Sequence, residues 1–375
     1  MKICIDGRAA KKYRGTGIGN YTYEIISNLN QIDFLNEYNI LTPKASPLDL
    51  QNKNNFNYLP SNLGEENNFW EFIKKENPKQ SIIGDIYHVP QNGIGLSKVD
   101  GIKNIITLHD IIPIKMPETV SPTFLKIFHE NIDSILKNSD AIITVSNFSK
   151  EDISKYLSYK EDKIFVTPLA AGEIYKPLDK NKCLKFLKKH YKIEGNFLLY
   201  VGGFSPRKNI LGLIDAFNLV KSSYKKDLKL VILGTKGTSY EAYKRRVYDL
   251  NLSSSVIFTG FIPIEHMPIF YSASKALVYP SFYEGFGLPP LEAMACGTPV
   301  IASNKTSIPE ICKDSALLVD PYNAFDIKES ILNLLNDSKL YSFMIYKGLS
   351  HSSKFNWKKT AYNTLEIYKK VHLEF

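Results

Sequence analysis

One stretch constrains this chain more than any other. Residues 275–280, Lys-Ala-Leu-Val-Tyr-Pro, are mostly apolar and typical of a buried parallel strand. A loop with Gly285 and Gly287 follows, and then two prolines suited to the first turn of a helix, which Gly297 can end. A strand, a glycine turn and a helix N-terminus in this order favour a bound anion, because free N–H groups and the helix dipole meet there.

Two carboxylates accompany this turn. Glu284 lies in the loop, and Glu292 follows eight positions later in the expected helix. Carboxylates do not help to bind phosphate, but they accept hydrogen bonds from hydroxyl groups. The pair therefore indicates a ligand that carries both phosphate and sugar. The simpler alternative is a Rossmann crossover in which both glutamates are merely solvated, and a lone Glu-Gly pair would favour this interpretation.

The whole run closely resembles the signature of retaining glycosyltransferases of the GT-B fold, in glycosyltransferase family four. That signature has two glutamates with seven residues between them, followed by Ala-x-Ala-x-Gly-x-Pro-Val-Ile-Ala. The matching residues here are Glu284, Glu292, Ala293, Ala295, Gly297, Pro299, Val300, Ile301 and Ala302. The resemblance implies an α/β protein of the GT-B fold, with two Rossmann-like, doubly wound parallel-sheet domains that face a central cleft.

The resemblance also assigns roles within this run. It implies that Glu284 belongs to the catalytic set and accepts hydrogen bonds from the transferred sugar. The residues expected to bind the nucleotide part of the donor are Gly285, Phe286, Gly287, Leu288 and Glu292, with Glu292 on the ribose hydroxyls.

Length and charge agree with a two-domain organisation. At 375 residues we expect an acceptor-side domain at 1–170, a linker at 171–181 and a donor-binding domain at 182–356. In relatives a C-terminal helix, here 357–371, packs back on the first domain. Residues 1–180 hold 21 Lys and Arg against 22 Asp and Glu, and residues 181–375 hold 26 against 16. The basic excess suits an anionic ligand in the second half, although a basic soluble surface explains many of these lysines equally well.

Apolar runs alternate with helical stretches along the chain, which predicts doubly wound parallel sheets. The strands expected in the first half are 2–6, 38–42, 56–59, 86–89, 104–108, 140–145 and 164–168, with a helix at 69–75. Those expected in the second half are 197–201, 228–233, 256–259, 276–279, 299–302 and 316–319.

A second phosphate-binding feature follows the first of these later strands. Residues 202–209, Gly-Gly-Phe-Ser-Pro-Arg-Lys-Asn, place two adjacent cations in a glycine turn. Many relatives have an arginine where this chain has Gly203, and the resemblance makes Gly203 and Lys208 candidate donor-binding residues. The resemblance gives Lys208 and Arg207 the catalytic role of stabilising negative charge on the β-phosphate. No metal or other cofactor is therefore expected.

The first half carries its own glycine turn. Residues 15–20, Gly-Thr-Gly-Ile-Gly-Asn, lie in an expected loop at 7–20 that feeds a helix. A dinucleotide fingerprint would need glycine at position 20 and an acidic residue near 40–42, and both are missing, which argues against an NAD enzyme. In the family the corresponding loop approaches the donor diphosphate across the cleft, which makes Gly17 and Gly19 candidate donor-binding residues.

His109 ends another predicted strand and begins the segment His-Asp-Ile-Ile-Pro. Open α/β sheets bind ligands at the carboxyl ends of their strands. An isolated His-Asp pair is usually a turn with a satisfied imidazole. The family has a closely similar segment whose histidine points at the donor sugar, so His109 completes the expected catalytic set. For Asp110 the alternative to a role in the site is that it only caps the turn.

The remaining composition limits compartment and partners. The four cysteines are scattered without a Cys-x-x-Cys pair, which fits a reducing compartment. No signal peptide or membrane-length apolar run is evident, so we expect a cytoplasmic protein that can associate with the inner face of the membrane. No nucleic-acid reader motif is present, and nucleic acid is not an expected partner.

The resemblance implies transfer of a hexosyl unit, with retention of configuration, from a nucleotide-diphosphate sugar to a saccharide or lipid-linked saccharide acceptor in surface polysaccharide synthesis. The segments at 109–113 and 206–209 look most like mannosyltransferases that use GDP-mannose, with UDP-sugars and dTDP-deoxysugars as other options. Another GT-B enzyme, such as a nucleotide-sugar epimerase or a sugar phosphorylase, is one alternative. A catalytically silent partner subunit of another glycosyltransferase is a second.

Overall fold

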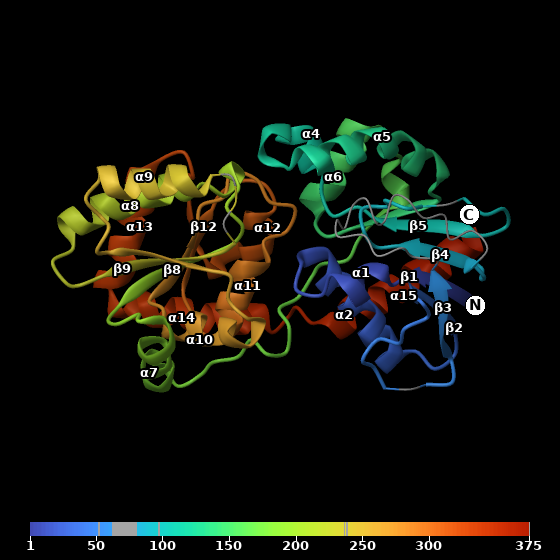
Figure 1. Ribbon diagram of the computed structural model, residues 1–375, viewed down its shortest axis with the longest axis horizontal. Coiled ribbons are helices and arrows are strands. Elements are labelled where there is room, and N and C mark those ends of the chain that lie inside the picture. The colour runs from blue at the N-terminus through green and yellow to red at the C-terminus, as the bar shows by residue number, and fades with distance from the viewer. Residues whose placement is uncertain (52, 62–80, 97, 236, 238, 375) are drawn as a thin grey trace. The chain divides into compact units, whose positions relative to one another are not determined.

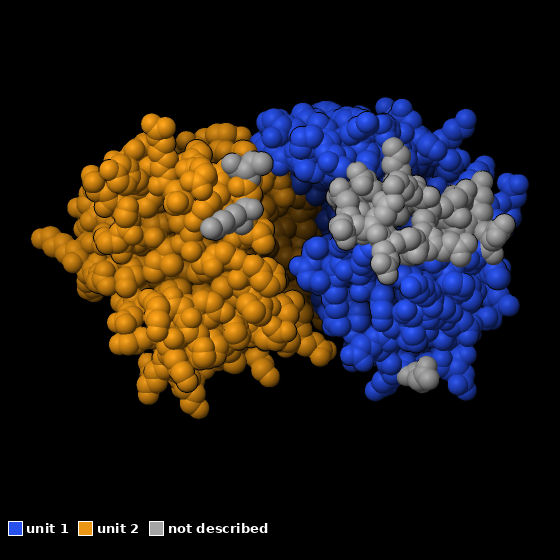
Figure 2. Space-filling model, viewed as in Figure 1, with its two compact units in different colours: residues 1–169, 357–375 blue, residues 170–356 orange. Residues whose placement is uncertain are grey.

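The computed structural model describes residues 1–375 except 52, 62–80, 97, 236, 238 and 375 (Figure 1). The chain forms two compact units (Figure 2): unit 1 comprises residues 1–169 and 357–375, and unit 2 comprises residues 170–356. The helix expected at 69–75 lies outside the described residues. Each unit consists of one parallel sheet with helices packed on it, and each is described by itself.

Unit 1 contains a seven-stranded sheet in the order β3-β2-β1-β4-β5-β6-β7. All neighbouring strands in it are parallel. Its strands are β1 (Lys2–Asp6), β2 (Glu37–Pro43), β3 (Phe56–Ser61), β4 (Ile86–Val89), β5 (Lys103–Thr107), β6 (Ala141–Thr144) and β7 (Ile164–Val166). Because β1 lies between β2 and β4, the direction of strand order reverses there. This reversal is the topological switch point at which open sheets bind ligands.

The helices of unit 1 come from both ends of the chain. They are α1 (Arg8–Lys12), α2 (Gly17–Ile32), α4 (Ile112–Lys115), α5 (Pro122–Asn138), α6 (Asn147–Leu157) and α15 (Trp357–Glu374), with short 3-10 turns at Pro117–Thr119 and Glu161–Lys163. Helix α15 packs against α2. The Thr360 hydroxyl on α15 donates a hydrogen bond to the Pro168 carbonyl, 2.7 Å away. The last helix is therefore an integral part of unit 1.

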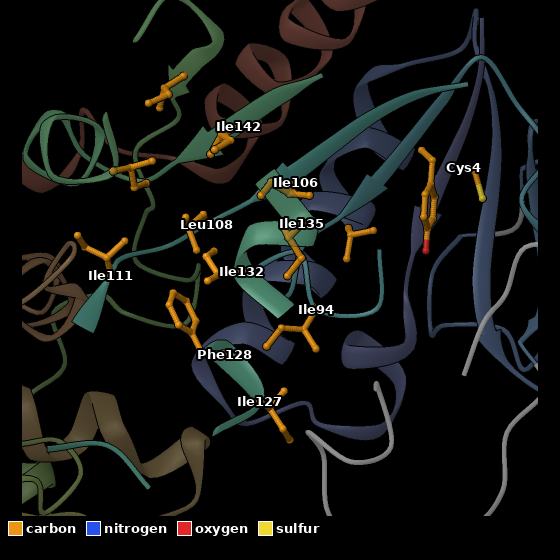
Figure 3. Close-up of a cluster of buried hydrophobic side chains, with 14 of the residues drawn as sticks. Cys4, Ile94, Ile106, Leu108, Ile111, Ile127, Phe128, Ile132, Ile135 and Ile142 are labelled. Carbon is orange, nitrogen blue, oxygen red and sulfur yellow. The ribbon is translucent and has the colours of Figure 1, made fainter. Parts of the chain in front are cut away.

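A cluster of branched apolar side chains forms one core of unit 1 (Figure 3). Phe128, Ile132 and Ile135 project from α5 toward the sheet, where Ile106 and Ile142 of β5 and β6 lie. All five side chains are at most 5% exposed. Burial of this kind stabilises by about 1.5–3 kcal/mol for each large apolar side chain. It holds β5 firmly, and with β5 the loop that carries His109.

Unit 2 contains a six-stranded sheet in the order β10-β9-β8-β11-β12-β13, again parallel throughout. Its strands are β8 (Phe197–Val201), β9 (Lys229–Leu233), β10 (Val256–Gly260), β11 (Ala276–Tyr279), β12 (Val300–Ser303) and β13 (Leu317–Val319). Its helices are α7 (Lys180–Tyr191), α8 (Ile210–Ser223), α9 (Tyr240–Asp249), α10 (Met267–Ala273), α11 (Leu288–Ala295), α12 (Ile308–Cys312), α13 (Ala324–Asn336) and α14 (Ser338–Ser352), with 3-10 turns at Pro206–Lys208, Ile264–His266 and Lys313–Ser315. The switch point of this sheet lies between β8 and β11.

The predicted fold class, two doubly wound parallel sheets, is confirmed. The prediction was wrong at the first glycine turn, where residues 7–20 were expected to form one loop. Instead, Arg8–Lys12 form helix α1, and α2 already begins at Gly17 with Thr16 as its N-cap. A five-residue helix is too short to be stable alone, so its formation depends on the packing of α1 against α2.

Candidate functional site

In unit 2 the two predicted phosphate-type segments lie at the switch point. Residues 202–209 follow β8, and residues 280–287 follow β11, which pairs directly with β8. The carboxyl ends of the two strands therefore bring both loops to the same edge of the sheet. The Phe282 N–H donates a hydrogen bond to the Arg207 carbonyl, 2.8 Å away, and joins the two loops.

Three predicted catalytic side chains meet there. Lys208 Nζ lies 2.6 Å from Glu284 Oε1, and Arg207 Nη1 lies 2.9 Å from Glu284 Oε2. The Tyr279 hydroxyl donates to Glu284 Oε1 at 2.9 Å and lies 2.7 Å from Lys208 Nζ. We refer to Arg207, Lys208 and Glu284 as the charged triad. The family resemblance implies a sugar-binding role for Glu284, and the geometry adds a second role, which is to hold both cations in place.

The charged triad is largely buried and carries a net positive charge. The side chains are 19%, 12% and 8% exposed for Arg207, Lys208 and Glu284. Burial alone would raise the pKa of Glu284, but Lys208 and then Arg207 lower it to about 2, so the carboxylate stays ionised. Two cations and one carboxylate leave one net positive charge at the sheet edge. A fixed cationic site that is largely withdrawn from water is suited to a phosphate group.

Asn209 and Ser307 fix the loops around the triad. The Asn209 amide donates to the carbonyls of Pro280 and Pro321, which follow β11 and β13. The Ser307 hydroxyl lies 2.8 Å from the Glu284 carbonyl and 3.0 Å from the Phe286 carbonyl. These contacts connect the ends of four strands, β8, β11, β12 and β13, so the triad rests on the sheet and does not depend on one loop alone.

The remaining predicted residues of these loops lie beside the triad. Gly287 is the N-cap of α11 at φ +101°, and a Cβ there would lie 2.5 Å from Ile308 Cδ1, so glycine is required. Leu288 is the first helical residue, while Gly285 and Phe286 are buried in the loop before it. Gly203 is exposed, and a Cβ there would meet no atom within 4 Å. This position is open to close approach by a ligand.

Glu292 belongs to a separate cluster. It lies in the second turn of α11, and its Oε2 accepts a hydrogen bond of 2.7 Å from the Tyr271 hydroxyl on α10. Burial raises its pKa, although hydrogen bonds from Tyr271 and Tyr175 act in the opposite direction. Glu292 is therefore held by two phenols, which leaves carboxylate acceptor positions for a ligand hydroxyl.

In unit 1, Gly17 and Gly19 both lie in the first turn of α2 and differ in their surroundings. A Cβ on Gly19 would lie 2.0 Å from the Tyr13 carbonyl oxygen, so this glycine permits the close packing of α1 on α2. Gly17 is exposed, and a Cβ there would meet nothing within 4 Å. Gly19 is thus required by the fold, while Gly17 leaves room next to the N-terminus of a 16-residue helix.

His109 follows β5 and is anchored by the loop after β4. Its backbone N–H donates to Asn92 Oδ1 at 3.1 Å, and its Nε2 lies 3.1 Å from the Pro90 carbonyl oxygen. Because a carbonyl can only accept, the proton is on Nε2. Burial lowers the pKa of His109 to about 4, so the neutral ring leaves Nδ1 as an acceptor. Asp110 Oδ1 accepts from the Ile112 N–H at 3.0 Å and caps the turn.

Sequence reasoning missed a buried ion pair at the switch point of unit 1. Asp6, the last residue of β1, and Arg8 in α1 are both 0% exposed, with Arg8 Nη2 2.6 Å from Asp6 Oδ2. Gln91, after β4, donates to the same oxygen. The signal was available, because both residues flank Gly7 at a strand end. Tyr271 and Tyr279 were missed for another reason: they lie in runs whose apolar character indicated only core.

Two general findings complete the site. Among the residues that the structure describes, no group of three or more His, Cys, Asp or Glu side chains is arranged to hold a metal ion. Over the same residues, none of the helices has the length and apolar character needed to cross a bilayer.

Comparison with known proteins identifies the family. The family model described as glycosyl transferases group 1 matches residues 185–351. O-antigen chain mannosyltransferase B of Escherichia coli is 31% identical over 373 residues, which cover 96% of this chain and 97% of that protein. The serotype-specific mannosyltransferase WbdA of Escherichia coli is 30% identical over 72% of this chain, but the match spans only 34% of its length.

Solved structures show the same fold across the whole chain. Sucrose-phosphate synthase from Thermosynechococcus elongatus matches with a TM-score of 0.76 at 21% identity and covers 99% of both chains. HepE from Anabaena, in complex with UDP and glucose, matches with a TM-score of 0.74 at 17% identity, over 99% of this chain and 100% of that one. The predicted GT-B fold is thereby confirmed. The chain belongs to the glycosyl transferases group 1, glycosyltransferase family four, whose members are retaining hexosyltransferases.

Proposed function

We propose that the protein transfers a mannosyl unit from GDP-mannose to a saccharide or lipid-linked saccharide acceptor in surface polysaccharide synthesis. The observation that carries the donor chemistry is the charged triad of Arg207, Lys208 and Glu284, with distances of 2.9 and 2.6 Å at the switch point of unit 2. Its net positive charge is fixed, partly buried and held by loops that follow four strands of the sheet. Such a site stabilises the negative charge that develops on a diphosphate leaving group.

The residues around the triad would each bind a different part of the donor. The backbone N–H groups at the start of α11, near Gly287 and Leu288, would complement Lys208 and Arg207 at the β-phosphate. Glu292, held by Tyr271, would accept hydrogen bonds from the ribose hydroxyls. Gly203 would allow the diphosphate to approach the backbone.

Unit 1 would contribute to the transferred sugar. The Nδ1 atom of neutral His109 can accept a hydrogen bond from a sugar hydroxyl, since Nε2 donates to Pro90. Gly17, open at the N-terminus of α2, would leave room for a phosphate oxygen of the donor. Glu284 would add its remaining acceptor capacity to the sugar while it positions the two cations.

The choice of mannose comes from the relatives. The protein with 31% identity over nearly the whole chain is an O-antigen chain mannosyltransferase. O-antigen chain mannosyltransferase RfbU of Salmonella typhimurium is 32% identical over 61% of this chain. Both names refer to O-antigen, which supports a polysaccharide acceptor at the cell surface.

A thermal-shift panel of GDP, UDP, dTDP and ADP, each with and without its sugar, tests the donor. A donor at 100 times its dissociation constant should add about 2.7 kcal/mol to the free energy of unfolding. We expect the largest shift with GDP-mannose, and a larger shift with another nucleotide sugar would contradict the choice of donor.

Transfer of labelled mannose from GDP-mannose to short mannose-containing oligosaccharides tests the reaction. We expect transfer with retained anomeric configuration, and we expect Lys208→Met to abolish it while Lys225→Met, on an exposed helix-to-strand connection, does not. Release of nucleotide and free sugar products without any acceptor requirement would favour an epimerase. Release of sugar 1-phosphate from the oligosaccharide and added inorganic phosphate, without any nucleotide sugar, would favour a phosphorylase.

A further inference from the structure

A chain of buried polar groups crosses unit 1 from its last helix to α2. The Tyr368 hydroxyl on α15 lies 2.6 Å from His88 Nδ1, and His88 Nε2 lies 2.8 Å from Thr107 Oγ1. Thr107 Oγ1 lies 3.0 Å from the Tyr21 hydroxyl on α2. All four residues are at most 2% exposed. We call this set, Tyr368, His88, Thr107 and Tyr21, the buried relay.

The buried relay ends against His109. The Tyr21 ring meets the imidazole edge to face, with centroids 4.7 Å apart and an interplanar angle of 87°. The Tyr21 ring also meets Trp357, the first residue of α15, with the two ring centroids 6.2 Å apart. Helix α15 thus contacts Tyr21 directly through Trp357 and indirectly through Tyr368.

These contacts restrain His109 in a way that its own hydrogen bond does not. The bond from Nε2 to the Pro90 carbonyl fixes one atom of the ring, but the ring can still tilt about it. The edge-to-face contact with Tyr21 limits that tilt, since aromatic pairs prefer a defined geometry. The direction in which the Nδ1 lone pair points therefore depends on where Tyr21 lies.

We propose that Tyr21 is a positioning residue for His109, and that the buried relay to Tyr368 holds Tyr21 in place. The C-terminal helix then supports the site from within unit 1. This inference rests on the proposed function, because the action of His109 on the donor sugar belongs to it. Tyr21 itself touches no substrate in this scheme.

The relay is sensitive to the loss of one member. Burial keeps His88 neutral by lowering its pKa to about 3, so one ring nitrogen donates and the other accepts. Removal of the Tyr368 hydroxyl leaves one nitrogen of His88 without its partner, and buried polar groups do not tolerate this without rearrangement. A shift of about 1 Å in a positioned group can lower turnover by about 100-fold.

Three variants and one control test the proposal. Tyr21→Leu removes the ring, Tyr21→Phe keeps the ring but cuts the relay, and Tyr368→Phe cuts it at the far end. Tyr87→Phe is the matched control, because Tyr87 is fully buried on β4 next to His88, and its hydroxyl has no hydrogen-bond partner within the described part of the chain. We expect kcat to fall about 10- to 100-fold for Tyr21→Leu, with donor affinity unchanged and smaller losses for the two Phe variants. We expect no change in kcat for Tyr87→Phe.

Nitrogen NMR of the seven histidines provides a readout that turnover does not. The His109 signals, assigned from their absence in His109→Ala, should report a neutral ring with the proton on Nε2. We expect these signals to shift or broaden in Tyr21→Leu and Tyr368→Phe and to stay in place in Tyr87→Phe. Unchanged His109 signals in the folded Tyr21→Phe and Tyr368→Phe variants would overturn the relay, and this measurement needs no substrate.

A double-mutant cycle separates the two levels of the proposal. If Tyr21 acts through His109, Tyr21→Leu should cost little further turnover in a His109→Ala background. An equal cost in both backgrounds would show that Tyr21 acts elsewhere and would overturn the inference. If His109→Ala alone leaves turnover unchanged, the proposed role of His109 fails, while the NMR comparison still decides whether Tyr21 positions it.

Discussion

Replacement of Lys208 by methionine tests the physical description of the charged triad directly. The substitution keeps the length of the apolar stem and removes the cation that lies 2.6 Å from Glu284 Oε1. The carboxylate stays buried, and Arg207 at 2.9 Å and the Tyr279 hydroxyl remain as its partners. The removal of one partner of a buried ion pair is costly, because the other charge loses its compensation and cannot return to water.

The magnitude follows from the pKa of Glu284. A carboxyl whose pKa falls from 4.5 to about 2 on folding contributes about 3 kcal/mol to the free energy of unfolding at neutral pH. Lys208 is the larger of the two cationic causes, so Lys208→Met should lose most of this contribution. For a domain of the size of unit 2, we expect a decrease in Tm of about 5–12 °C.

The pH dependence provides a second check with a definite sign. The folded pKa of Glu284 is lowered, so its contribution is fully present above pH 4.5 and is lost as the pH falls through about 2. The difference in stability between wild type and Lys208→Met should therefore be constant near neutral pH and shrink as the pH falls below about 4.5. The double variant Lys208→Met/Glu284→Gln should recover part of the lost stability, because a neutral amide needs no cation.

Circular dichroism and tryptophan fluorescence of the full chain can separate the two units. Trp357, the first residue of α15, belongs to unit 1, so its fluorescence follows that unit, while circular dichroism follows both units. We expect Lys208→Met to shift the circular dichroism transition, and Lys225→Met, an exposed lysine, to leave it in place. A loss of stability that is independent of pH, or no loss at all, would refute the view that Lys208 stabilises the fold through the Glu284 carboxylate.

Three further predictions follow from other parts of the site. Glu292→Gln should be at least as stable as wild type near pH 8. Burial raises the pKa of Glu292, so ionisation of this carboxyl lowers the stability of the folded state as the pH rises, and a glutamine avoids this loss. Calorimetry should show weaker GDP binding, and unchanged binding would contradict its ribose role. Tyr279→Phe removes hydrogen bonds to Glu284 and Lys208, and urea unfolding should show a loss of about 1.5–3 kcal/mol, against no loss for Tyr87→Phe. Gly19→Ala should lower the Tm of unit 1 through the 2.0 Å contact with the Tyr13 carbonyl, while Gly17→Ala should leave the Tm unchanged and lower turnover if a donor phosphate approaches there.

The strands were the most predictable part of this fold. Residues 197–201 and 276–279 were predicted with the bounds that the structure gives, because a buried parallel strand is a short continuous apolar run between polar or glycine-containing segments. Helix α1 was not predicted. Its five residues carry no helical periodicity, and its stability comes from contacts with α2 and from the buried Asp6–Arg8 pair, which are tertiary features.

The sequence could predict which residues belong to the site, but not which of them contact one another. Lys208 and Glu284 are separated by 76 positions, and each has a plausible role in isolation. Their contact depends on the adjacency of β8 and β11, strands with two others between them in the sequence. Local patterns identify a strand end and a charged side chain, but strand order decides which strand ends meet. Tyr279 and Tyr271, which hold Glu284 and Glu292, were not predicted for a related reason. A tyrosine in an apolar run is interpreted as a core residue, and the sequence does not show which group its hydroxyl contacts.

The two sets of candidate residues differ in charge, and this difference has a chemical consequence. The charged triad of unit 2 keeps one net positive charge across the physiological pH range, because the pKa of Glu284 is about 2 and its partners are Lys208 and Arg207. His109 of unit 1 stays neutral over the same range, because its pKa is about 4. A protonated imidazole would be a second centre of attraction for a diphosphate and could no longer accept a hydrogen bond at Nδ1. A neutral imidazole does not compete with the triad for the phosphate, and its Nδ1 can accept a hydrogen bond from the O–H of a sugar. The low pKa of His109 therefore favours the division of roles that we propose.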